Sequence, residues 1–357
     1  FLEEELIVNS FYNDQIQCSG KILTNNDIDW EMKATIDSQI AESWTGNLLE
    51  ESVVIDLDIT GSQGGSKGHF ASDLTSGEFT IDWSDKEIIG DVRLDSTWTS
   101  KGIVENFYAE FAFLNGLLDV NWESDLHDVS IKYDSWKLST HLQGHTTFHD
   151  GFKDAALTFT NPLLKKNIST PPIFSDVFNL NLVLNGKYLD IDIDSDILDS
   201  KGVVNIEEET WGTWWESAKR LSDDSSNLKG LLTRGTCSLY KSEALVRMFD
   251  LPLKFADGTE AVWSLSAEKY QAEVISDWIS INDVVVKHPV INISGGTSEY
   301  SLYAEISEMN KNEALIAKGL EMELLGDTIW SYRCTWENSQ KTGGFMKIYG
   351  EKEKNWE

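Results

Sequence analysis

An all-β fold is what the sequence predicts: a long antiparallel meander with an alternating apolar face, either an open β-groove or a sandwich, that carries a short helical insertion. Apolar and polar residues alternate over most of the 357 residues, as they do in half-buried strands. Two Asn-Gly pairs, Asn115-Gly116 and Asn185-Gly186, lie between such stretches and are typical of tight hairpins. The 14 Trp, 15 Phe and 10 Tyr provide the large apolar surface that such a face needs.

The N-terminal antiparallel β segment is expected over residues 1–168, and its clearest hairpin turns at Asn115-Gly116. Apolar residues alternate with polar ones on both sides of this turn, as they also do from Val53 to Ile59. The alternating apolar residues of the hairpin are Phe107, Ala109, Phe111, Phe113, Leu118, Val120 and Trp122. One face of this segment is therefore expected to be apolar.

A β-hairpin continuation is expected over residues 173–206, after a proline-containing boundary at 169–172. Its turn is Asn185-Gly186, and the alternation on either side of the turn assigns two opposite faces. The sheltered positions are expected to be Leu180, Leu182, Leu184, Ile191 and Ile193, and the water-facing positions Asp190, Asp192 and Asp194.

A helical insertion is expected over residues 207–253, because the apolar period changes there. Trp211, Trp214 and Trp215 recur at helical spacing, and Ser242 is placed to begin a short helix that Pro252 ends. The C-terminal β segment, residues 254–357, resumes the alternation, with a late hairpin that turns at Gly326-Asp327.

The net charge of −31 argues against nucleic acid as a partner, because this field repels phosphate backbones. Cys18, Cys237 and Cys334 form no CxxC pair, so they leave the redox compartment undecided. No apolar run is long enough to span a bilayer, and no signal peptide is visible. Since the chain begins at Phe1 without a methionine, we expect a processed product or a piece of a longer protein.

No motif of an enzyme is present in the sequence. It contains no GxSxG, no P-loop and no GxGxxG dinucleotide frame, so we expect no catalytic residues and no cofactor. With 60 acidic residues, carboxylate pairs suited to glycoside hydrolysis arise by chance. A carbohydrate-active enzyme is therefore kept only as a third hypothesis.

Two clusters resemble metal ligands, and for both the non-metal interpretation is favoured. Asp190, Asp192, Asp194 and Asp196 alternate, so a strand places them on one face, as a solvated surface or a calcium site. Position six of a calcium loop would be Ser195 rather than Gly, which argues against calcium. His141, His145 and His149 are four residues apart, a spacing that would place them on one face of a helix. The residues around them are typical of a strand and a turn instead, so we expect the three side chains to point in different directions. We expect no metal.

The aromatic residues in alternating stretches allow three interpretations: the core of a sandwich, an apolar floor that holds acyl chains, or exposed Trp rings that stack on sugars. The second makes the apolar face a ligand-binding surface. Its candidate residues are Phe107, Phe111, Val120, Trp122, Leu180, Leu182, Trp330 and Trp336.

The stretches GEFTIDWSDKEIIGDVRLDSTW (77–98) and FNLNLVLNGKYLDIDIDSDILDSKGVVNI (178–206) resemble the hairpin arrays of AsmA-like and TamB-type bacterial envelope proteins, including their YdbH-type relatives. The resemblance covers roughly 50–206 and, more weakly, 256–349, and it rests on alternating strands, Asn/Gly turns and Asp-rich outer faces. The Trp-rich segment 207–253 departs from the family pattern. These families have no catalytic motif, so no site residue is carried over.

The resemblance implies a periplasmic, non-enzymatic protein whose β-groove shields the acyl chains of phospholipid or another lipid between two membranes. Its implied protein partners are other segments of a longer envelope protein or a membrane-embedded protein. The alternative is a secreted carbohydrate-binding or adhesion β-sandwich, in which some Trp and acidic residues point outward.

Overall fold

The structure is a computed structural model that divides into two compact units, residues 1–179 (unit 1) and 180–357 (unit 2). The boundary lies within strand β13 (Val177–Asn185), a few residues after the proline-containing segment where the sequence places it. The residues described are 5–12, 16–24, 28–37, 54–72, 75–84, 86–99, 102–131, 136–149, 151–166, 170–205, 233–249, 251–266, 269–296, 299–326, 329–337 and 343–351.

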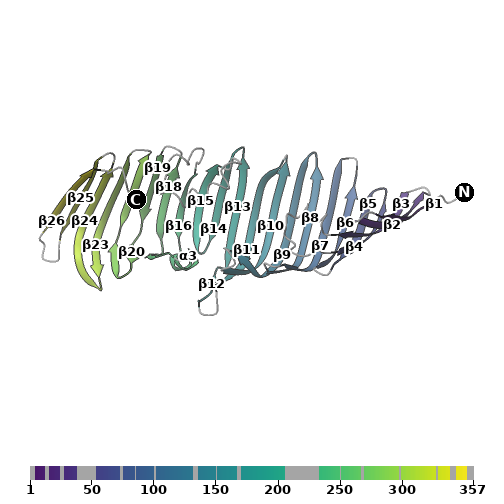
Figure 1. Cartoon of the computed structure of the whole chain (residues 1–357), viewed down its shortest axis with the longest axis horizontal. Coiled ribbons are helices and arrows are strands. Elements are labelled where there is room, and N and C mark those ends of the chain that lie inside the picture. The colour runs from purple at the N-terminus through teal and green to yellow at the C-terminus, as the bar shows by residue number, and fades with distance from the viewer. Residues whose placement is uncertain are drawn as a thin grey trace. The chain divides into compact units, whose positions relative to one another are not determined.

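Unit 1 is an antiparallel sheet in which each strand from β1 to β11 pairs with the next along the chain. Figure 1 shows these strands side by side, from purple to teal. The short β12 pairs with the end of β11. The bounds are β1 Glu5–Tyr12, β2 Ile16–Thr24, β3 Ile28–Asp37, β4 Val54–Ser62, β5 Gly65–Ala71, β6 Thr75–Trp83, β7 Glu87–Thr99, β8 Gly102–Leu114, β9 Leu117–Ile131, β10 Trp136–His149, β11 Phe152–Lys165 and β12 Ile173–Phe174.

The hairpin between β8 and β9 forms at the predicted turn. Asn115 and Gly116 both have positive φ, 52° and 81°, as a tight two-residue hairpin turn requires. Asn tolerates this left-handed conformation and Gly adopts it without a Cβ penalty. The turn therefore sets the register that places Phe111 opposite Val120.

Three long strands of unit 1 carry bulges at non-glycine residues with positive φ. These are Asn106 in β8 (φ 52°), Asp128 in β9 (φ 50°) and Asn161 in β11 (φ 51°), and the strand register shifts beside each. A bulge adds one residue to one strand and bends it. Because β8 to β11 are neighbours, the bulges bend the same margin of the sheet.

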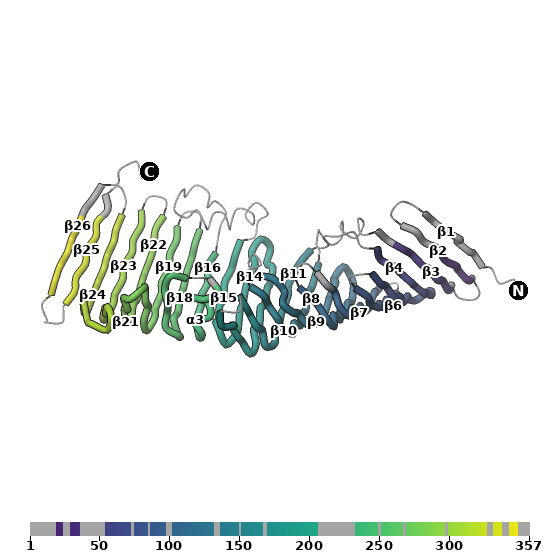
Figure 2. The backbone as a smooth tube through the Cα atoms, turned by 60° about the horizontal axis from the view of Figure 1, so that its bottom comes forward, coloured from purple at the N-terminus to yellow at the C-terminus, as the bar shows by residue number. Residues whose placement is uncertain are grey.

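Unit 2 continues with the same antiparallel pairing. From β14 the order of paired strands is β15, β16, β18, β19, β22, β23, β24, β25 and β26, and β17, β20 and β21 form a side branch that joins the second half of β23. Figure 2 shows these strands from teal to yellow. The bounds are β14 Tyr188–Ser195, β15 Leu198–Asn205, β16 Thr233–Leu239, β17 Leu253–Phe255, β18 Thr259–Leu265, β19 Lys269–Ile275, β20 Trp278–Ile281, β21 Val284–Lys287, β22 Val290–Gly296, β23 Tyr300–Lys311, β24 Ala314–Gly326, β25 Ile329–Glu337 and β26 Gly343–Glu351.

The expected helical insertion is only partly helical. Helix α3 runs from Ser242 to Phe249 and ends before Pro252, as expected, but Thr233–Leu239 is strand β16 rather than helix. The carboxylate of Asp257 accepts the first backbone N–H of α3, that of Ser242, at 2.9 Å. Trp211, Trp214 and Trp215 lie outside the described residues.

The all-β fold class, with antiparallel strands and a short helical insertion, is confirmed. Within each unit the described strands form one layer, which favours the open sheet over the sandwich. Among the described residues of unit 2, Ile306, Leu320 and Cys334 form a cluster of buried side chains. Among the described residues, no helix is long and apolar enough to cross a membrane.

Candidate functional site

One face of unit 1 is an apolar surface that continues from strand to strand. Phe111 lies opposite Val120 and Ala109 lies opposite Trp122 on the neighbouring strand. Because directly paired residues share a face, the register extends this surface across β7 to β10. We call it the floor of unit 1. Its large side chains include Leu57, Ile59, Phe70, Phe79, Val92, Leu94, Phe107, Phe111, Val120, Trp122, Leu142 and Phe159.

The opposite face of unit 1 is polar, and its side chains form ion pairs and hydrogen bonds between neighbouring strands. Lys33 Nζ donates to Asp58 Oδ2 at 2.8 Å, and the hydroxyl of Thr35 donates to Asp56 Oδ1 at 2.8 Å. Such exposed pairs contribute little to stability, but they place the acidic residues of the chain in water. We call this the outer face.

Unit 2 repeats the two faces. Leu302, Leu324 and Tyr332 lie opposite one another on β23, β24 and β25, and Met322 lies opposite Cys334. The alternate positions on these strands are polar, for example Glu323 beside Leu324. The floor of unit 2 includes Ile191, Ile193, Trp263, Val274, Ile291, Leu302, Met322, Leu324, Tyr332 and Trp336.

Aromatic rings lie over glycines of the neighbouring strand on both floors. A Cβ placed on Gly144 would lie 2.6 Å from Nε1 of Trp122, and one on Gly235 would lie 2.6 Å from the ring of Trp263. Real Cβ atoms keep at least 3.0 Å, so each ring occupies the space that the glycine leaves. The same arrangement joins Trp30 to Gly61, Phe70 to Gly77, Phe79 to Gly68, Phe111 to Gly90, Tyr270 to Gly295, Tyr300 to Gly326 and Trp336 to Gly344. Each of these rings therefore packs against the backbone of the neighbouring strand.

The candidate residues from the sequence lie on these floors as far as the structure describes them. Phe107, Phe111, Val120 and Trp122 share the floor of unit 1. In unit 2, Trp336 lies on the floor, and Leu180 and Leu182 lie on the sheltered face of β13. The backbone of Trp330 pairs with Gly326, but its side chain lies outside the described residues.

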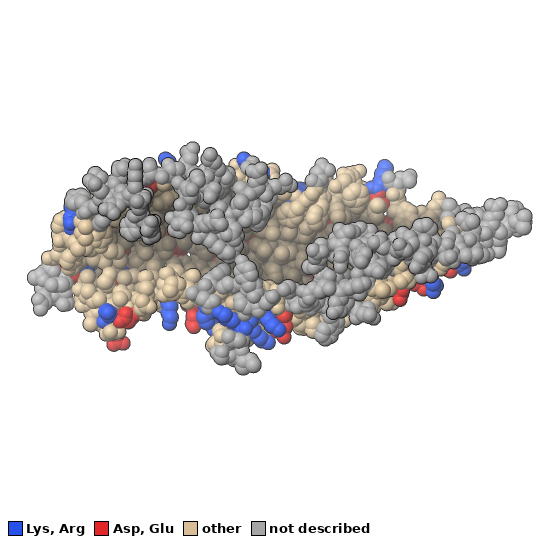
Figure 3. All heavy atoms as spheres, viewed as in Figure 1, with Lys and Arg blue, Asp and Glu red and all other residues tan. Residues whose placement is uncertain are grey.

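Large apolar side chains remain accessible to water at the ends of the unit 1 floor strands. Ile88 is 39% exposed, Phe113 is 41% exposed and Phe148 is 36% exposed. Figure 3 shows a hollowed surface over β8 to β10 with few charged side chains, which gather instead at its margins. Among the described residues, no second sheet packs on this face, which leaves an apolar patch that favours a ligand or partner.

The aspartate row of β14 takes the predicted orientation. Asp192 forms an ion pair with Lys201, with Nζ 3.1 Å from Oδ2, and Asp190 accepts a hydrogen bond from Asn185 Nδ2 at 2.6 Å. Neither is buried, and Ile191 and Ile193 lie on the other face. The row is therefore part of a solvated, paired outer face.

The expectation that the histidines scatter was wrong. His141 and His145 lie on the same face of the 14-residue strand β10, since residues four apart on a strand share a face. Their ring nitrogens lie 2.8 Å from Asp125 Oδ1 and 3.0 Å from Asp119 Oδ1. Each histidine is thus paired separately with a carboxylate of β9. Among the described residues, no group of three or more His, Cys, Asp or Glu side chains is placed to hold a metal.

The Asp125 carboxyl has a pKa below its ordinary value, because Asn106 Nδ2 donates to it at 2.8 Å and the His141 ring pairs with it at 2.8 Å. A depressed folded pKa stabilises the fold above the unfolded value, about 3.9, and that contribution is lost as the pH falls through the folded pKa. We expect His141→Ala to raise the pKa of Asp125 and to move acid unfolding to higher pH. Carboxyl NMR and circular dichroism across an acid titration measure both.

His149→Ala is the matched control for this titration. His149 lies on the same strand, and its ring nitrogen lies 3.2 Å from the Gly116 carbonyl oxygen instead of a carboxylate. We expect it to leave the Asp125 titration unchanged. An equal effect of both variants on Asp125 would contradict the assigned cause.

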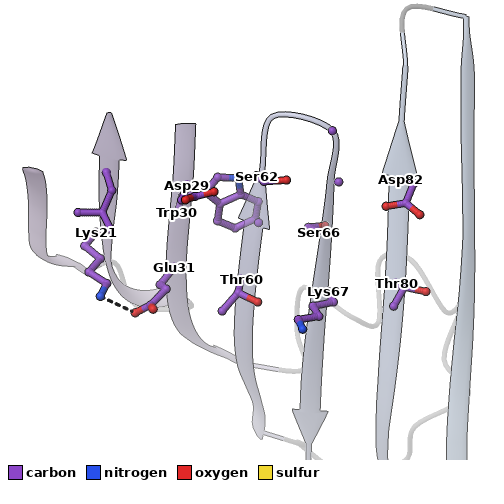
Figure 4. Close-up of a pocket in the computed structure, with 14 residues that line it drawn as sticks. Lys21, Asp29, Trp30, Glu31, Thr60, Ser62, Ser66, Lys67, Thr80 and Asp82 are labelled. Carbon is purple, nitrogen blue, oxygen red and sulfur yellow. Dashed lines mark ion pairs between the residues drawn. The ribbon is translucent and has the colours of Figure 1, made fainter. Parts of the chain in front are cut away.

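A polar cavity of about 550 Å³ lies on the outer face of unit 1. Figure 4 shows Lys21 and Glu31 on one side of it, joined by an ion pair of 3.2 Å, with Thr60 and Lys67 across from them. Trp30 and Gly61, which lie opposite each other on β3 and β4, also line this cavity. Its polar groups and one ring suit a sugar better than an acyl chain.

No family model, curated protein or solved structure matches this chain. The assignment of the apolar floors as the candidate site therefore depends on the strand register and the side-chain geometry. Sequence reasoning identified the apolar face but missed the glycines on which the rings lie. The available signal was a glycine at a floor position within an alternating stretch, as at Gly77, Gly90 and Gly144.

Proposed function

We propose that the floors hold lipid acyl chains and that the protein is a non-enzymatic lipid carrier or shield of the cell envelope. The observation that carries the proposal is the set of aromatic rings packed on cross-strand glycines, all on the apolar face. This arrangement makes a smooth apolar surface in a single-layered sheet whose other face is charged. A soluble chain with such a surface gains stability when the surface is covered.

An acyl chain suits this surface physically. Burying apolar area contributes about 25 cal/mol per Å², or about 0.8 kcal/mol for each methylene, so a long chain gains several kcal/mol without a specific pocket. Ring faces and branched aliphatic side chains tolerate a chain that slides along them, since dispersion contacts have no direction. The floor thus replaces water around the chain and does no covalent chemistry.

An extracytoplasmic, periplasmic location belongs to the same proposal, because a lipid shield is needed where acyl chains cross water between two membranes. The implied partners are phospholipid or another lipid and, at the ends of the sheet, other segments of an envelope protein or a membrane-embedded protein. The charge of −31 agrees with a carrier that does not adhere to anionic bilayers over its whole outer face.

The test is a pair of double variants on the same strand, β13. We expect Leu180→Asp with Leu182→Asp to abolish lipid that copurifies with the protein, as measured by mass spectrometry. A charge on the floor must either lose its hydration against an acyl chain or bring water under it. Strand content measured by circular dichroism is expected to stay unchanged, because both leucines are only half-buried.

Asn181→Asp with Val183→Asp is the control, since both side chains are exposed on the other face of β13. It adds the same number of charges and is expected to keep the lipid. Absence of lipid from the unmodified protein, or equal loss in both variants, contradicts the proposal. If the protein binds an oligosaccharide saturably and carries no lipid, the carbohydrate-binding alternative is favoured, with the polar cavity beside Trp30 as its site.

A further inference from the structure

The tip of the β8–β9 hairpin departs from the alternation found in the middle of these two strands. There the outer face carries polar residues, such as Glu110 and Asn121, which lie opposite each other. At the tip the outer face instead carries Leu114 and Leu117, which also lie opposite each other. The stretch from Phe111 to Leu118 contains no charged residue. The outer face is therefore apolar at the tip, where the pattern calls for polar side chains.

The floor is apolar at the same margin, so apolar side chains lie on both faces of the sheet there. On the floor, Phe113 lies opposite Leu118 on β9 and Ile88 on β7. On the outer face, Ile89 and Leu114 are each 43% exposed. Figure 1 shows β7, β8 and β9 side by side. We call this set of residues the apolar margin: Ile88, Ile89, Phe113, Leu114, Leu117 and Leu118.

Most coverings of an apolar surface leave one of these two faces in water. A ligand on the floor covers one face of the sheet, and so does a second sheet packed on it. Another strand cannot extend the sheet here, because the tip consists of strand ends joined by a turn and not of an unpaired strand edge. The interface of a lipid bilayer surrounds both faces at once. It is therefore the covering that suits the apolar margin.

The backbone at the tip also suits a surrounding of low polarity. Unpaired backbone N–H and C=O groups are costly in lipid. Leu114 and Leu117 are paired across a two-residue turn, so only Asn115 and Gly116 lie beyond the last pair of the β8–β9 ladder. The hairpin thus presents apolar side chains with little unpaired backbone.

We propose that the apolar margin inserts into the interface of a bilayer of net-neutral phospholipid and docks the protein on that membrane. The insertion is shallow, because Glu87 lies opposite Leu114 and Asp119 lies opposite Ala112 on the outer face. Since the net charge is −31, the attraction comes from burial of apolar side chains and not from anionic headgroups. This docking goes beyond the proposed function, because it requires no acyl chain on the floor.

The test is flotation of the protein with phosphatidylcholine vesicles. Ile89→Ser with Leu114→Ser changes only the outer face, which the proposed lipid floor does not use. We expect this double variant to bind the vesicles at least roughly tenfold more weakly than the unmodified protein, because two aliphatic side chains no longer gain from burial in the interface. Circular dichroism and thermal unfolding verify that the variant remains folded.

Ile275→Ser with Leu325→Ser is the matched control, since it removes the same two residue types from exposed positions of unit 2. Ile275 is 44% exposed and lies opposite Glu260. Leu325 is 42% exposed and lies opposite Ser301. We expect vesicle binding by this variant to stay unchanged. Equal losses in both double variants would show that binding follows general surface hydrophobicity, and would overturn the inference.

Vesicle composition and salt distinguish apolar insertion from attraction between charges. We expect vesicles that also contain phosphatidylglycerol to bind the protein no better than phosphatidylcholine alone, and added salt not to release it. Binding that requires phosphatidylglycerol and is lost in salt contradicts insertion of the apolar margin.

A second copy of the chain is the other occupant that the experiment distinguishes. Sedimentation velocity without vesicles measures self-association of the unmodified protein. If the protein forms a dimer that Ile89→Ser with Leu114→Ser dissociates, the apolar margin is a contact between copies and the bilayer proposal is overturned.

The outcomes also separate this inference from the proposed function. Leu180→Asp with Leu182→Asp is expected to lose copurified lipid and still bind vesicles, whereas Ile89→Ser with Leu114→Ser is expected to keep copurified lipid. Vesicle binding by a protein that never carries lipid supports the apolar margin and overturns the proposed function. If the unmodified protein does not float with phosphatidylcholine vesicles, the inference is overturned even where lipid copurifies.

Discussion

Leu320→Ala is expected to lower the free energy of unfolding of unit 2 by about 2–5 kcal/mol, the range for removing a buried leucine side chain. Leu320 is 5% exposed and packs with Ile306 and Cys334, and Met322 and Trp336 cover this cluster. A single-layered sheet has few such sites, because most of its floor residues are only half-buried. The cavity therefore removes a large share of the apolar packing that holds β23, β24 and β25 together.

Leu325→Ala is the control on the same strand. Leu325 is 42% exposed on the outer face, and its truncation is expected to change stability by less than about 0.5 kcal/mol. Urea titration measures both variants, and native-state hydrogen exchange assigns the loss to unit 2, since two units need not unfold together. Equal losses in both variants would show that burial at Leu320 does not anchor this region.

The hairpins and the two faces could be predicted from the sequence because each depends on local information. Asn115-Gly116 specifies its own turn conformation, and a period of two fixes which face a side chain takes once the turn sets the register. The water-facing aspartates of β14 followed from the same rule. Four of the candidate floor residues come from the β8–β9 hairpin, where this local signal is strongest.

Other features depended on contacts between strands and could not be read locally. The bulges at Asn106, Asp128 and Asn161 are visible only when two strands are aligned. Strand β16 was missed because the helical spacing of Trp211 to Trp215 was extended over it, although Gly235, Cys237 and Leu239 alternate. Pairing with β15 and β18 decides its conformation. Tertiary context overrides weak local preference in such segments.

The glycines under the aromatic rings were missed for a related reason. A glycine inside a strand weakens it in isolation, and only the partner strand reveals the ring that fills its place. In the sequence of β7 alone, for example, Gly90 is a destabilising residue. Only the pairing with β8 shows that Phe111 lies opposite it and that its ring fills the space.

Gly144→Ala is expected to lower the free energy of unfolding of unit 1 by about 1–3 kcal/mol, as overpacking does, and to lift the ring of Trp122 from the sheet. The new Cβ would lie within 3.0 Å of the ring, and the three nearest atoms all belong to the Trp122 side chain. The ring must therefore rotate while the backbone stays. A raised ring interrupts the smooth floor, so the variant should also retain less lipid. Tryptophan fluorescence, urea titration and lipid mass spectrometry measure the three effects.

Gly202→Ala is the matched control, since Gly202 is also a floor glycine, lies opposite Gly235 and has Trp263 Cζ2 no closer than 3.9 Å to a new Cβ. The carbonyl oxygen of Arg234 lies 3.3 Å away, so a small adjustment suffices. We expect stability to change by less than about 1 kcal/mol, because alanine reduces the entropy of the unfolded chain. If both variants keep their lipid and their fluorescence, the rings on the glycines contribute to packing alone. Loss confined to Gly144→Ala would tie the ring orientation to the ligand, because the two substitutions add the same methyl group to the same kind of surface.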